Sequence, residues 1–352
     1  MEKSELSQLN LIAGVFIHHL LVRPGPIGFL PCLVQSVFSL FEPSYLRLHE
    51  NGELDERIEQ LDKILESCEL CPRRCGVNRL KGEKGVCRSG KDLVVSNFGP
   101  HFGEEEPLVG VGGSGTIFLT NCSLHCVYCQ NYEISHLGYG ELRSESQVAD
   151  YMIALQRMGC HNINFVTPTH FAPQLVRAVR NGIQKGLRLP LIWNCGGYEN
   201  AGTVELLDGI VDIYMPDIKY SSSEPAEKYS DAGDYFPIVK EVVKEMHRQV
   251  GDLRLDERGI AERGLLIRHL VLPNDLAGSG EVLRFIAEIS TDSYVNVMAQ
   301  YRPAGRAHKY EELKRPSSRK EFEKVMELAY SFGLTRGLEQ KNLLRHRRVH
   351  FI

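Results

Sequence analysis

From residue 116 onward, apolar residues alternate between two spacings along the chain. Short continuous apolar runs, typical of buried strands, are separated by segments in which apolar residues recur every three or four positions, as on one face of a helix. We expect Ser146 to cap the first of these helices. The predicted strands are 116–120, 161–166, 189–194, 210–215, 264–271 and 294–299, and the predicted helices are 146–159, 173–185, 203–207, 237–250, 281–289 and 318–332.

This alternation amounts to six consecutive β/α units. Strands that alternate with helices fold into a parallel sheet whose strands are joined by crossover helices. The chain has 352 residues, which is enough for a barrel-type domain with a small addition. The fold class that we expect is therefore α/β, with a parallel sheet at its centre.

Two apolar runs, 11–22 and 29–41, precede the first amphipathic helix, which is predicted at 53–66. Neither run reaches the roughly 20 residues that a membrane span needs, and the first residues lack the positive charge of a signal peptide. We expect residues 1–47 to form a poorly ordered apolar extension, with a membrane-associated hairpin as the alternative. We interpret residues 335–352 as a basic, solvated tail.

Bulk composition excludes some classes of partner. The net charge is −4, and 24% of the residues are charged, so neither a nucleic-acid partner nor wholesale disorder is indicated. Seven of the ten cysteines fall in two tight groups with the spacing of metal ligands, which favours a reducing cytoplasm over disulfides. We expect the other three, Cys32, Cys160 and Cys195, to be structural.

The first group of cysteines has the spacing C-x2-C-x3-C-x11-C, with a proline and several glycines between the thiols. Four soft thiolate ligands on a segment rich in turns indicate a closed metal site. Structural zinc, an auxiliary iron–sulfur cluster and free thiols all stay open at this point. We assign residues 48–110 to a small module that contains the helix at 53–66 and these ligands, Cys68, Cys71, Cys75 and Cys87.

The second group, Cys122, Cys126 and Cys129, has the spacing C-x3-C-x2-C and directly follows the first predicted strand. Iron–sulfur clusters are usually held by four cysteines, so three would fix a [4Fe–4S] cluster and leave one iron open. An open coordination position is reactive, as it is in catalytic zinc sites. The alternative is three core cysteines on one face of a helix, which the preceding strand disfavours.

This spacing, with Tyr128 just before the last cysteine, resembles the signature of the radical S-adenosylmethionine (SAM) enzymes. In that family the free iron is chelated by the amino and carboxylate groups of SAM, and reductive cleavage yields a 5′-deoxyadenosyl radical that takes hydrogen from a substrate. Further stretches resemble the pyruvate formate-lyase activating enzyme-like proteins of the PflX-like branch, and the likeness covers residues 48–334. These stretches are Cys68 to Arg79, His101 to Glu105, Gly110 to Gly115 and Cys129 to Asn131.

The resemblance implies a partial (β/α)6 barrel of the TIM type in residues 111–334, beside the small cysteine-rich module. The active face of such a barrel lies at the carboxyl ends of its strands. Thr167-Pro168-Thr169-His170 stands where activating enzymes carry a Gly-Gly-Glu that meets the SAM amino group, while Asp217-Ile218-Lys219 resembles their Asp-Leu-Lys. The cofactor-binding residues that we expect are Tyr128, Gln130, Thr167, Asn194, Asp217, Lys219 and Arg268, and no catalytic residue is assigned beyond the cluster ligands.

The resemblance implies a radical SAM oxidoreductase of an anaerobe, supplied with electrons by a donor such as flavodoxin or ferredoxin. Its substrate would be a glycine of a glycyl-radical enzyme, or in the alternative another protein or a small molecule. An iron–sulfur electron-transfer or assembly protein is the alternative outside enzymes. For a peptide substrate we expect Tyr198, Tyr220, Tyr301 and Arg302 to line the barrel mouth.

Overall fold

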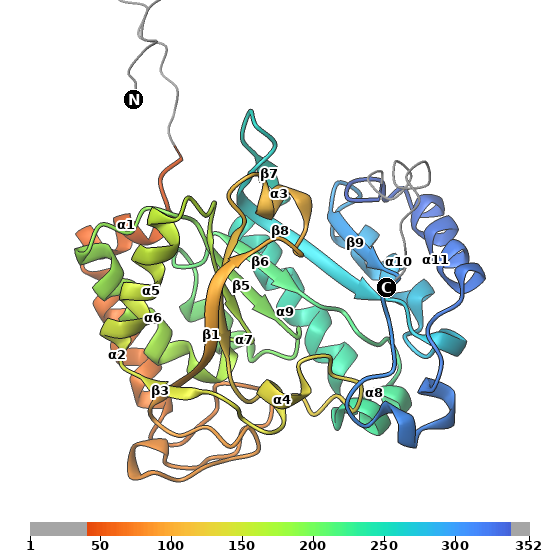
Figure 1. The fold of residues 1–352 in the computed structure, drawn as a ribbon, viewed down its shortest axis with the longest axis horizontal. Coiled ribbons are helices and arrows are strands. Elements are labelled where there is room, and N and C mark those ends of the chain that lie inside the picture. Colours follow the sequence, from red (N-terminus) through yellow and green to blue (C-terminus); the bar gives the residue numbers. More distant parts are fainter. Residues whose placement is uncertain (1–40, 339–352) are drawn as a thin grey trace, which may run out of the picture. The chain divides into compact units, whose positions relative to one another are not determined.

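The computed structural model describes residues 41–338, which Figure 1 shows as a ribbon. Residues 1–40 of the predicted extension, Cys32 and the basic tail beyond residue 338 lie outside the described residues. The described chain begins with α1 (Ser44–Glu50), which was not predicted, and α2 (Glu53–Ile64), which confirms the amphipathic helix expected there. Among the helices of residues 41–338, none combines the length and apolar character that a bilayer crossing needs.

Within residues 41–338, nine strands form the sheet in the order β3-β1-β2-β4-β5-β6-β8-β7, with β9 paired to β8. Its parallel strands are β2 (Ser114–Leu119), β4 (Ile163–Val166), β5 (Leu191–Cys195), β6 (Ile213–Pro216), β8 (Ala261–Leu270) and β9 (Tyr294–Met298). The intervening helices are α5 (Glu145–Arg157), α6 (Ala172–Gln184), α7 (Ala201–Leu206), α9 (Tyr235–Val250), α10 (Ser279–Ile289) and α11 (Arg319–Ser331). The predicted α/β fold with a parallel sheet and six β/α units is confirmed.

Several short or half-exposed elements were not predicted. They are the antiparallel strands β1 (Leu93–His101), β3 (Glu141–Arg143) and β7 (Arg254–Leu255), and the helices α3 (Glu106–Val109), α4 (Tyr132–Ser135) and α8 (Ser223–Ser230). Single 3-10 turns lie at 79–81, 169–171, 273–275, 307–309 and 311–313.

The expected cap of α5 at Ser146 is wrong. Ser144 occupies the N-cap, where its hydroxyl accepts a hydrogen bond from the Gln147 N–H while the Gln147 side chain accepts one from the Ser144 N–H. This reciprocal pair satisfies two backbone donors at the helix start. The helix therefore begins one residue after Ser144, and Ser146 lies in its first turn.

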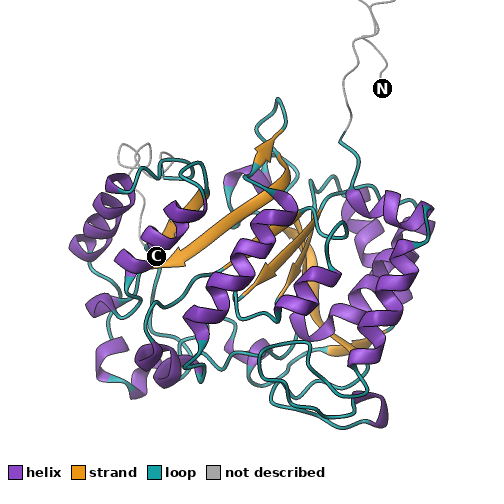
Figure 2. Cartoon of the chain, turned by 180° about the vertical axis from the view of Figure 1, so that it is seen from behind, coloured by secondary structure: helices purple, strands orange, loops and turns teal. Residues whose placement is uncertain are grey.

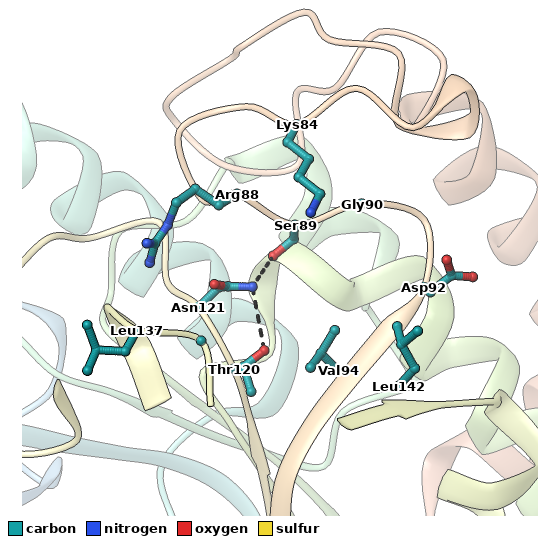
Figure 3. A pocket seen from close by; sticks show the side chains of 11 residues that line it. Lys84, Arg88, Ser89, Gly90, Asp92, Val94, Thr120, Asn121, Leu137 and Leu142 are labelled. Atoms are coloured by element: carbon teal, nitrogen blue, oxygen red, sulfur yellow. Dashed lines mark hydrogen bonds between the residues drawn. The ribbon is translucent and has the colours of Figure 1, made fainter. Parts of the chain in front are cut away.

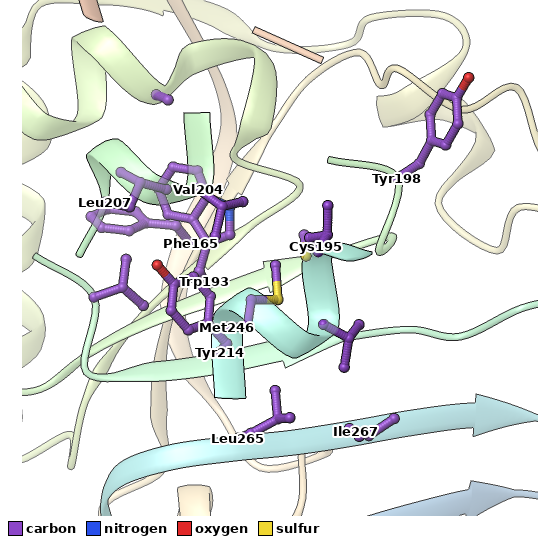
Figure 4. Packing of buried hydrophobic residues seen from close by; sticks show 14 of the residues in the cluster. Phe165, Trp193, Cys195, Tyr198, Val204, Leu207, Tyr214, Met246, Leu265 and Ile267 are labelled. Atoms are coloured by element: carbon purple, nitrogen blue, oxygen red, sulfur yellow. The ribbon is translucent and has the colours of Figure 1, made fainter. Parts of the chain in front are cut away.

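Each central strand is buried on both faces, which explains its continuous apolar run. On the outer face, Phe165, Trp193 and Tyr214 pack against side chains of α7 and α9, as Figure 4 shows. Figure 2 shows from behind how helices cover this outer face. The inner face has a separate apolar core, formed by Leu108, Ile192, Ile213, Met215, Leu253, Ala261, Leu266 and Tyr294.

The segment between β1 and β2, residues 102–113, closes the inside of the sheet. Leu108 is fully buried in the inner core, and the Glu105 carboxylate accepts a hydrogen bond of 2.6 Å from Asn296 on β9. The glycines that follow allow close backbone packing, because a Cβ at Gly112 would lie 1.9 Å from the Gly159 carbonyl oxygen. This glycine-rich stretch is therefore explained by packing.

Replacing Leu108 by alanine should lower the free energy of unfolding by about 2–5 kcal/mol, because it leaves a cavity in the inner core. Urea denaturation followed by circular dichroism measures the change. Val111, which is 94% exposed, provides the control, since Val111→Ala should stay within about 0.5 kcal/mol of the wild type. Equal effects of the two substitutions would contradict the buried position of the segment.

Candidate functional site

A cavity of about 350 Å³ lies at the carboxyl ends of the parallel strands. The pairing of Val166 with Asn194, and of Asn194 with Met215, brings the ends of β4, β5 and β6 to one level. The loop after β2 supplies another part of the wall. All but one of the residues predicted to bind SAM and its cluster line this cavity. They are Cys122, Cys126, Cys129, Gln130, Thr167, Asn194, Asp217, Lys219 and Arg268.

The loop that carries the three cysteines is held by backbone contacts from distant parts of the chain. The Val127 N–H donates to the Tyr229 carbonyl at 2.8 Å, and the Arg306 N–H donates to the Val127 carbonyl at 2.7 Å. Asn121, at φ +67, turns the chain out of β2. Residues 121–131 contain no helix, so the alternative of three core cysteines on a helix face is wrong.

Each of the three sulfur atoms accepts one hydrogen bond. The donors are the Leu124 N–H to Cys122 Sγ at 3.4 Å, the Ser230 hydroxyl to Cys126 Sγ at 3.0 Å, and the Ser135 hydroxyl to Cys129 Sγ at 3.2 Å. Hydrogen bonds to sulfur stabilise the thiolates that ligate an iron–sulfur cluster and tune its potential.

The protonation state of these thiols follows from their burial. Burial raises the pKa of the Cys122 and Cys126 thiols, so they are protonated without metal and release protons when metal binds. No three Cys, His, Asp or Glu side chains within residues 41–338 are placed to hold a single ion. A [4Fe–4S] cluster bonds each thiolate to a different iron and needs no such convergence on one ion. The three cysteines therefore fit a [4Fe–4S] cluster.

A buried network of charges forms the opposite wall. Asp217 accepts from Arg268 Nε at 2.8 Å and from Lys219 Nζ at 2.5 Å. Arg268 also donates to the Asn194 side-chain oxygen at 2.7 Å. Burial by itself would raise the pKa of Asp217, but the Arg268 and Lys219 cations outweigh it and hold that pKa below its ordinary value. Asp217 is thus ionised between two cations.

Sequence reasoning missed Glu104 and His101, which also line the cavity. Glu104 Oε2 lies 3.4 Å from Arg268 Nη1, and Glu104 Oε1 lies 3.7 Å from His101 Nδ1. Burial raises the pKa of Glu104, with the Arg268 charge acting against it. The adjacent Glu104 and Glu105 of the His101 to Glu105 motif could have indicated a binding site. They were missed because they do not follow a predicted parallel strand in the sequence.

Tyr128 is the one predicted cofactor-binding residue that does not line the cavity. It is buried in an aromatic cluster, with ring centroids 6.4 Å from Tyr220 and 5.8 Å from Tyr301. The expectation that Tyr198, Tyr220 and Tyr301 line the barrel mouth is wrong, because each is at most 3% exposed. Their hydroxyls bind groups of the protein itself, for example the Leu313 carbonyl, which accepts from Tyr301 at 2.8 Å. Of that set only Arg302 is exposed.

The four cysteines of the N-terminal module lie close together. Cys68, Cys71 and Cys87 are buried, and Cys75 Sγ accepts a hydrogen bond of 3.3 Å from the Val86 N–H. Burial raises the pKa of the Cys71 thiol to about 12, and the neighbouring thiols act in the same direction. The segments around the four thiols are therefore folded onto one another.

The module also packs against the loop that carries Cys122, Cys126 and Cys129. Arg73 Nε donates to the Ser123 carbonyl at 3.0 Å, and the Asn121 side chain donates to Ser89 Oγ at 3.2 Å. A second cavity of about 340 Å³ lies at this junction, where Figure 3 shows Arg88 and Lys84 over Asn121. Residues next to Cys87 thus contact residues next to Cys122.

Comparisons with known proteins found a family profile, a relative and a solved structure to which this chain is similar. The profile of the Radical SAM superfamily matches residues 116–253. The uncharacterized protein MJ0674 of Methanocaldococcus jannaschii is 32% identical over 307 residues, which cover 84% of each chain. The solved structure of native anSMEcpe with bound AdoMet has a TM-score of 0.38 and 15% identity, and the match covers 60% of this chain and 57% of that one. This last likeness is too distant to locate a ligand here.

The matched residues begin in β2, include the C-x3-C-x2-C loop and its three hydrogen-bonded sulfur atoms, and extend to the loop before β7. The chain therefore belongs to the radical SAM superfamily.

Proposed function

We propose that the cavity at the strand ends binds SAM beside a [4Fe–4S] cluster, and that the enzyme uses SAM to take a hydrogen atom from a substrate. Membership of the superfamily implies the cleavage of SAM with such a cluster. The observation that supports this site is that three cysteines, each with a hydrogen-bond donor on its sulfur, share one cavity with an ionised Asp217 and two cations.

Cys122, Cys126 and Cys129 would hold the cluster by three of its irons. When bound, the cluster supplies the electron that breaks the sulfonium C–S bond of SAM and so yields a 5′-deoxyadenosyl radical. Hydrogen bonds from Leu124, Ser135 and Ser230 keep the three sulfur atoms in place.

The charged residues of the opposite wall match the charges of SAM, which carries a carboxylate, an ammonium and a sulfonium group. Lys219 and Arg268 offer cations to the carboxylate. Asp217 accepts short hydrogen bonds from both of these cations, whereas Glu104 accepts one long hydrogen bond of 3.4 Å from Arg268 and lies 3.7 Å from His101. We assign the ammonium group to Glu104 and the ribose and adenine to polar groups at Asn194, Thr167 and Gln130.

Substituting alanine at any one of Cys122, Cys126 and Cys129 should abolish the formation of 5′-deoxyadenosine from SAM and dithionite in the anaerobically reconstituted protein, because each thiolate holds one iron. Chromatography of the nucleoside products measures this. Cys160 is buried outside the cavity, so Cys160→Ala should retain the reaction. Continued production of 5′-deoxyadenosine by a triple alanine variant would contradict the proposed function.

Glu104→Gln should raise the dissociation constant of SAM by roughly 10- to 100-fold, because a hydrogen bond to a charged group contributes about 1.5–3 kcal/mol. Titration calorimetry on the reconstituted protein measures it. Glu106 is exposed in the first turn of α3, so Glu106→Gln removes the same charge and should leave binding unchanged. 5′-Methylthioadenosine lacks the amino acid part of SAM, and Glu104→Gln should not alter its affinity; equal losses for both ligands would refute the ammonium assignment.

We further propose that Cys68, Cys71, Cys75 and Cys87 hold a second metal group. Four thiolates are the usual ligands of structural zinc and of iron–sulfur clusters. Because no three such side chains within residues 41–338 converge on a single ion, the arrangement favours the cluster, and zinc is the competing outcome. Metal analysis of a variant that lacks Cys122, Cys126 and Cys129 distinguishes about one zinc from about four irons. We also propose a reducing cytoplasm as the location, because two groups of cysteines with the spacing of metal ligands need reduced thiols.

For the substrate we propose the Cα–H of a glycine in a partner enzyme, supported by the resemblance of both cysteine motifs to activating enzymes. The burial of Tyr198, Tyr220 and Tyr301 removes the peptide-gripping surface expected from the sequence. Abstraction from another protein or a small molecule therefore stays a competing proposal.

Mixing the reduced enzyme, SAM and a glycyl-radical enzyme of the same host should produce the doublet of a glycine Cα radical in electron paramagnetic resonance. A partner in which the target glycine is replaced by alanine is the control and should give no signal. Formation of 5′-deoxyadenosine without any protein radical would reject glycine as the substrate and leave the SAM chemistry intact.

A further inference from the structure

We infer that a surface formed by Lys84, Arg88, Leu137, Tyr139 and Leu142, here called the donor surface, docks an acidic one-electron carrier protein. The inference rests on the proposed function, because SAM cleavage needs electrons from outside the protein. It adds the place where the donor binds and the chemistry that recognises it.

The donor surface combines exposed apolar and cationic side chains. Leu137, Tyr139 and Leu142 are 51%, 60% and 65% exposed. Leu137 and Leu142 line the second cavity together with Lys84 and Arg88, and Figure 3 shows these four side chains around it. Leu142 belongs to β3, which pairs only with β1 and forms one end of the sheet. A group of exposed large apolar residues rimmed by charges is typical of a protein interface.

The charge of this region favours an acidic partner. Residues 68–92 contain six Lys and Arg that are at least partly exposed, besides the buried Arg79, against three Asp and Glu, although the whole chain carries a net charge of −4. Neither Lys84 nor Arg88 takes part in an ion pair within the described part of the chain. Asp92 also lines the cavity, but Figure 3 shows it at the opposite end from Arg88. Exposed cations of this kind steer and orient an acidic protein.

A short path of bonds leads from the donor surface to the cluster ligands. Arg88 Nη2 donates to the Ser135 carbonyl at 3.3 Å, and the Ser135 hydroxyl donates to Cys129 Sγ at 3.2 Å. On the same side, Ser89 Oγ accepts from Asn121, the residue before Cys122. A donor bound here therefore lies two hydrogen bonds from a cluster ligand.

The position of the donor surface argues against a substrate as its occupant. Thr120 and Asn121 line the second cavity, whereas Leu119 and Cys122 line the cavity that we assign to SAM. The loop after β2 thus separates the two cavities. A substrate must reach the SAM cavity to lose its hydrogen, but an electron can cross the loop. Donor and substrate can then bind at the same time.

The test compares two charge reversals, with a bacterial flavodoxin, a small acidic flavoprotein, as the probe. The double variant Lys84→Glu, Arg88→Glu changes the donor surface. The control Lys240→Glu, Lys244→Glu changes two exposed lysines of α9. Two quantities are measured anaerobically at low ionic strength: the dissociation constant of flavodoxin by titration calorimetry, and the rate at which reduced flavodoxin or dithionite bleaches the reconstituted cluster without SAM. In this step one electron leaves the carrier and reduces the cluster.

We expect the donor-surface variant to bind flavodoxin at least tenfold more weakly and to be reduced by flavodoxin at least tenfold more slowly. Reduction of this variant by dithionite should match the wild type, because dithionite needs no docking. Added salt should weaken the wild-type interaction. Arg88→Lys, which keeps the charge, should keep the wild-type affinity.

An unchanged dissociation constant in the donor-surface variant, or an equal loss in the α9 control, would overturn the inference. The inference would also be overturned if the wild-type protein did not bind flavodoxin but self-associated through Lys84 and Arg88, because the occupant of the surface would then be a second copy. These results are separate from the test of the proposed function. Failure to form 5′-deoxyadenosine with dithionite refutes the SAM chemistry, whereas a failure restricted to flavodoxin refutes only the donor surface.

Discussion

The partly buried ion pair between Asp217 and Arg268 is the interaction on which both the sheet and the site depend. Regular pairing of β6 with β8 extends over only two residue pairs, Ile213 with Gly264 and Tyr214 with Leu265. Beyond it, an isolated bridge joins Asp217 to Arg268, and their side chains meet at 2.8 Å. Burying charges is costly, and removing one partner leaves the other uncompensated. The pair therefore holds β8 against β6 where the cavity opens, and it keeps charges ready for a charged ligand.

The segment between β1 and β2 supplies Glu104 to the lining of this cavity. It buries Leu108 in the inner core beneath the strand ends, and it places Glu104 against Arg268 and Glu105 against Asn296. Because the anchor of the segment is a buried leucine, the position of Glu104 is set by packing as well as by its long contact with Arg268.

The cysteine-rich module contacts the loops that follow β2 and β4. The guanidinium of Arg79 is buried, donates to the His170 carbonyl at 2.6 Å, and so ties the module to the loop after β4. Arg73 and Ser89 contact the loop after β2 from two sides. Any metal group held by the module would therefore stiffen the loop that presents Cys122, because the two segments share hydrogen bonds.

The sequence by itself determined the features that depend on local spacing. Six apolar runs identified the parallel strands, most clearly the central β4, β5 and β6, in which every residue is buried. The residues just after the strands, such as Asp217 and Lys219, were found because parallel strands end at one edge. The spacing of Cys122, Cys126 and Cys129 indicated a cluster because all three ligands lie on one short loop.

Only the tertiary structure decided the features that depend on contacts between distant segments. β1 has a polar, half-exposed second half and is a strand because it pairs with β2. Glu104 lines the cavity because Leu108 anchors its segment in the inner core and Arg268 lies opposite it. Tyr220 and Tyr301 lie after strands, as expected, yet their hydroxyls meet Ser230 and the Leu313 carbonyl in the interior. Tyr198 is covered as well, and its hydroxyl donates to Asp234 beside a separate surface cavity. The spacing of apolar residues carries no information about such partners, because they belong to other segments of the chain that only the fold brings into contact.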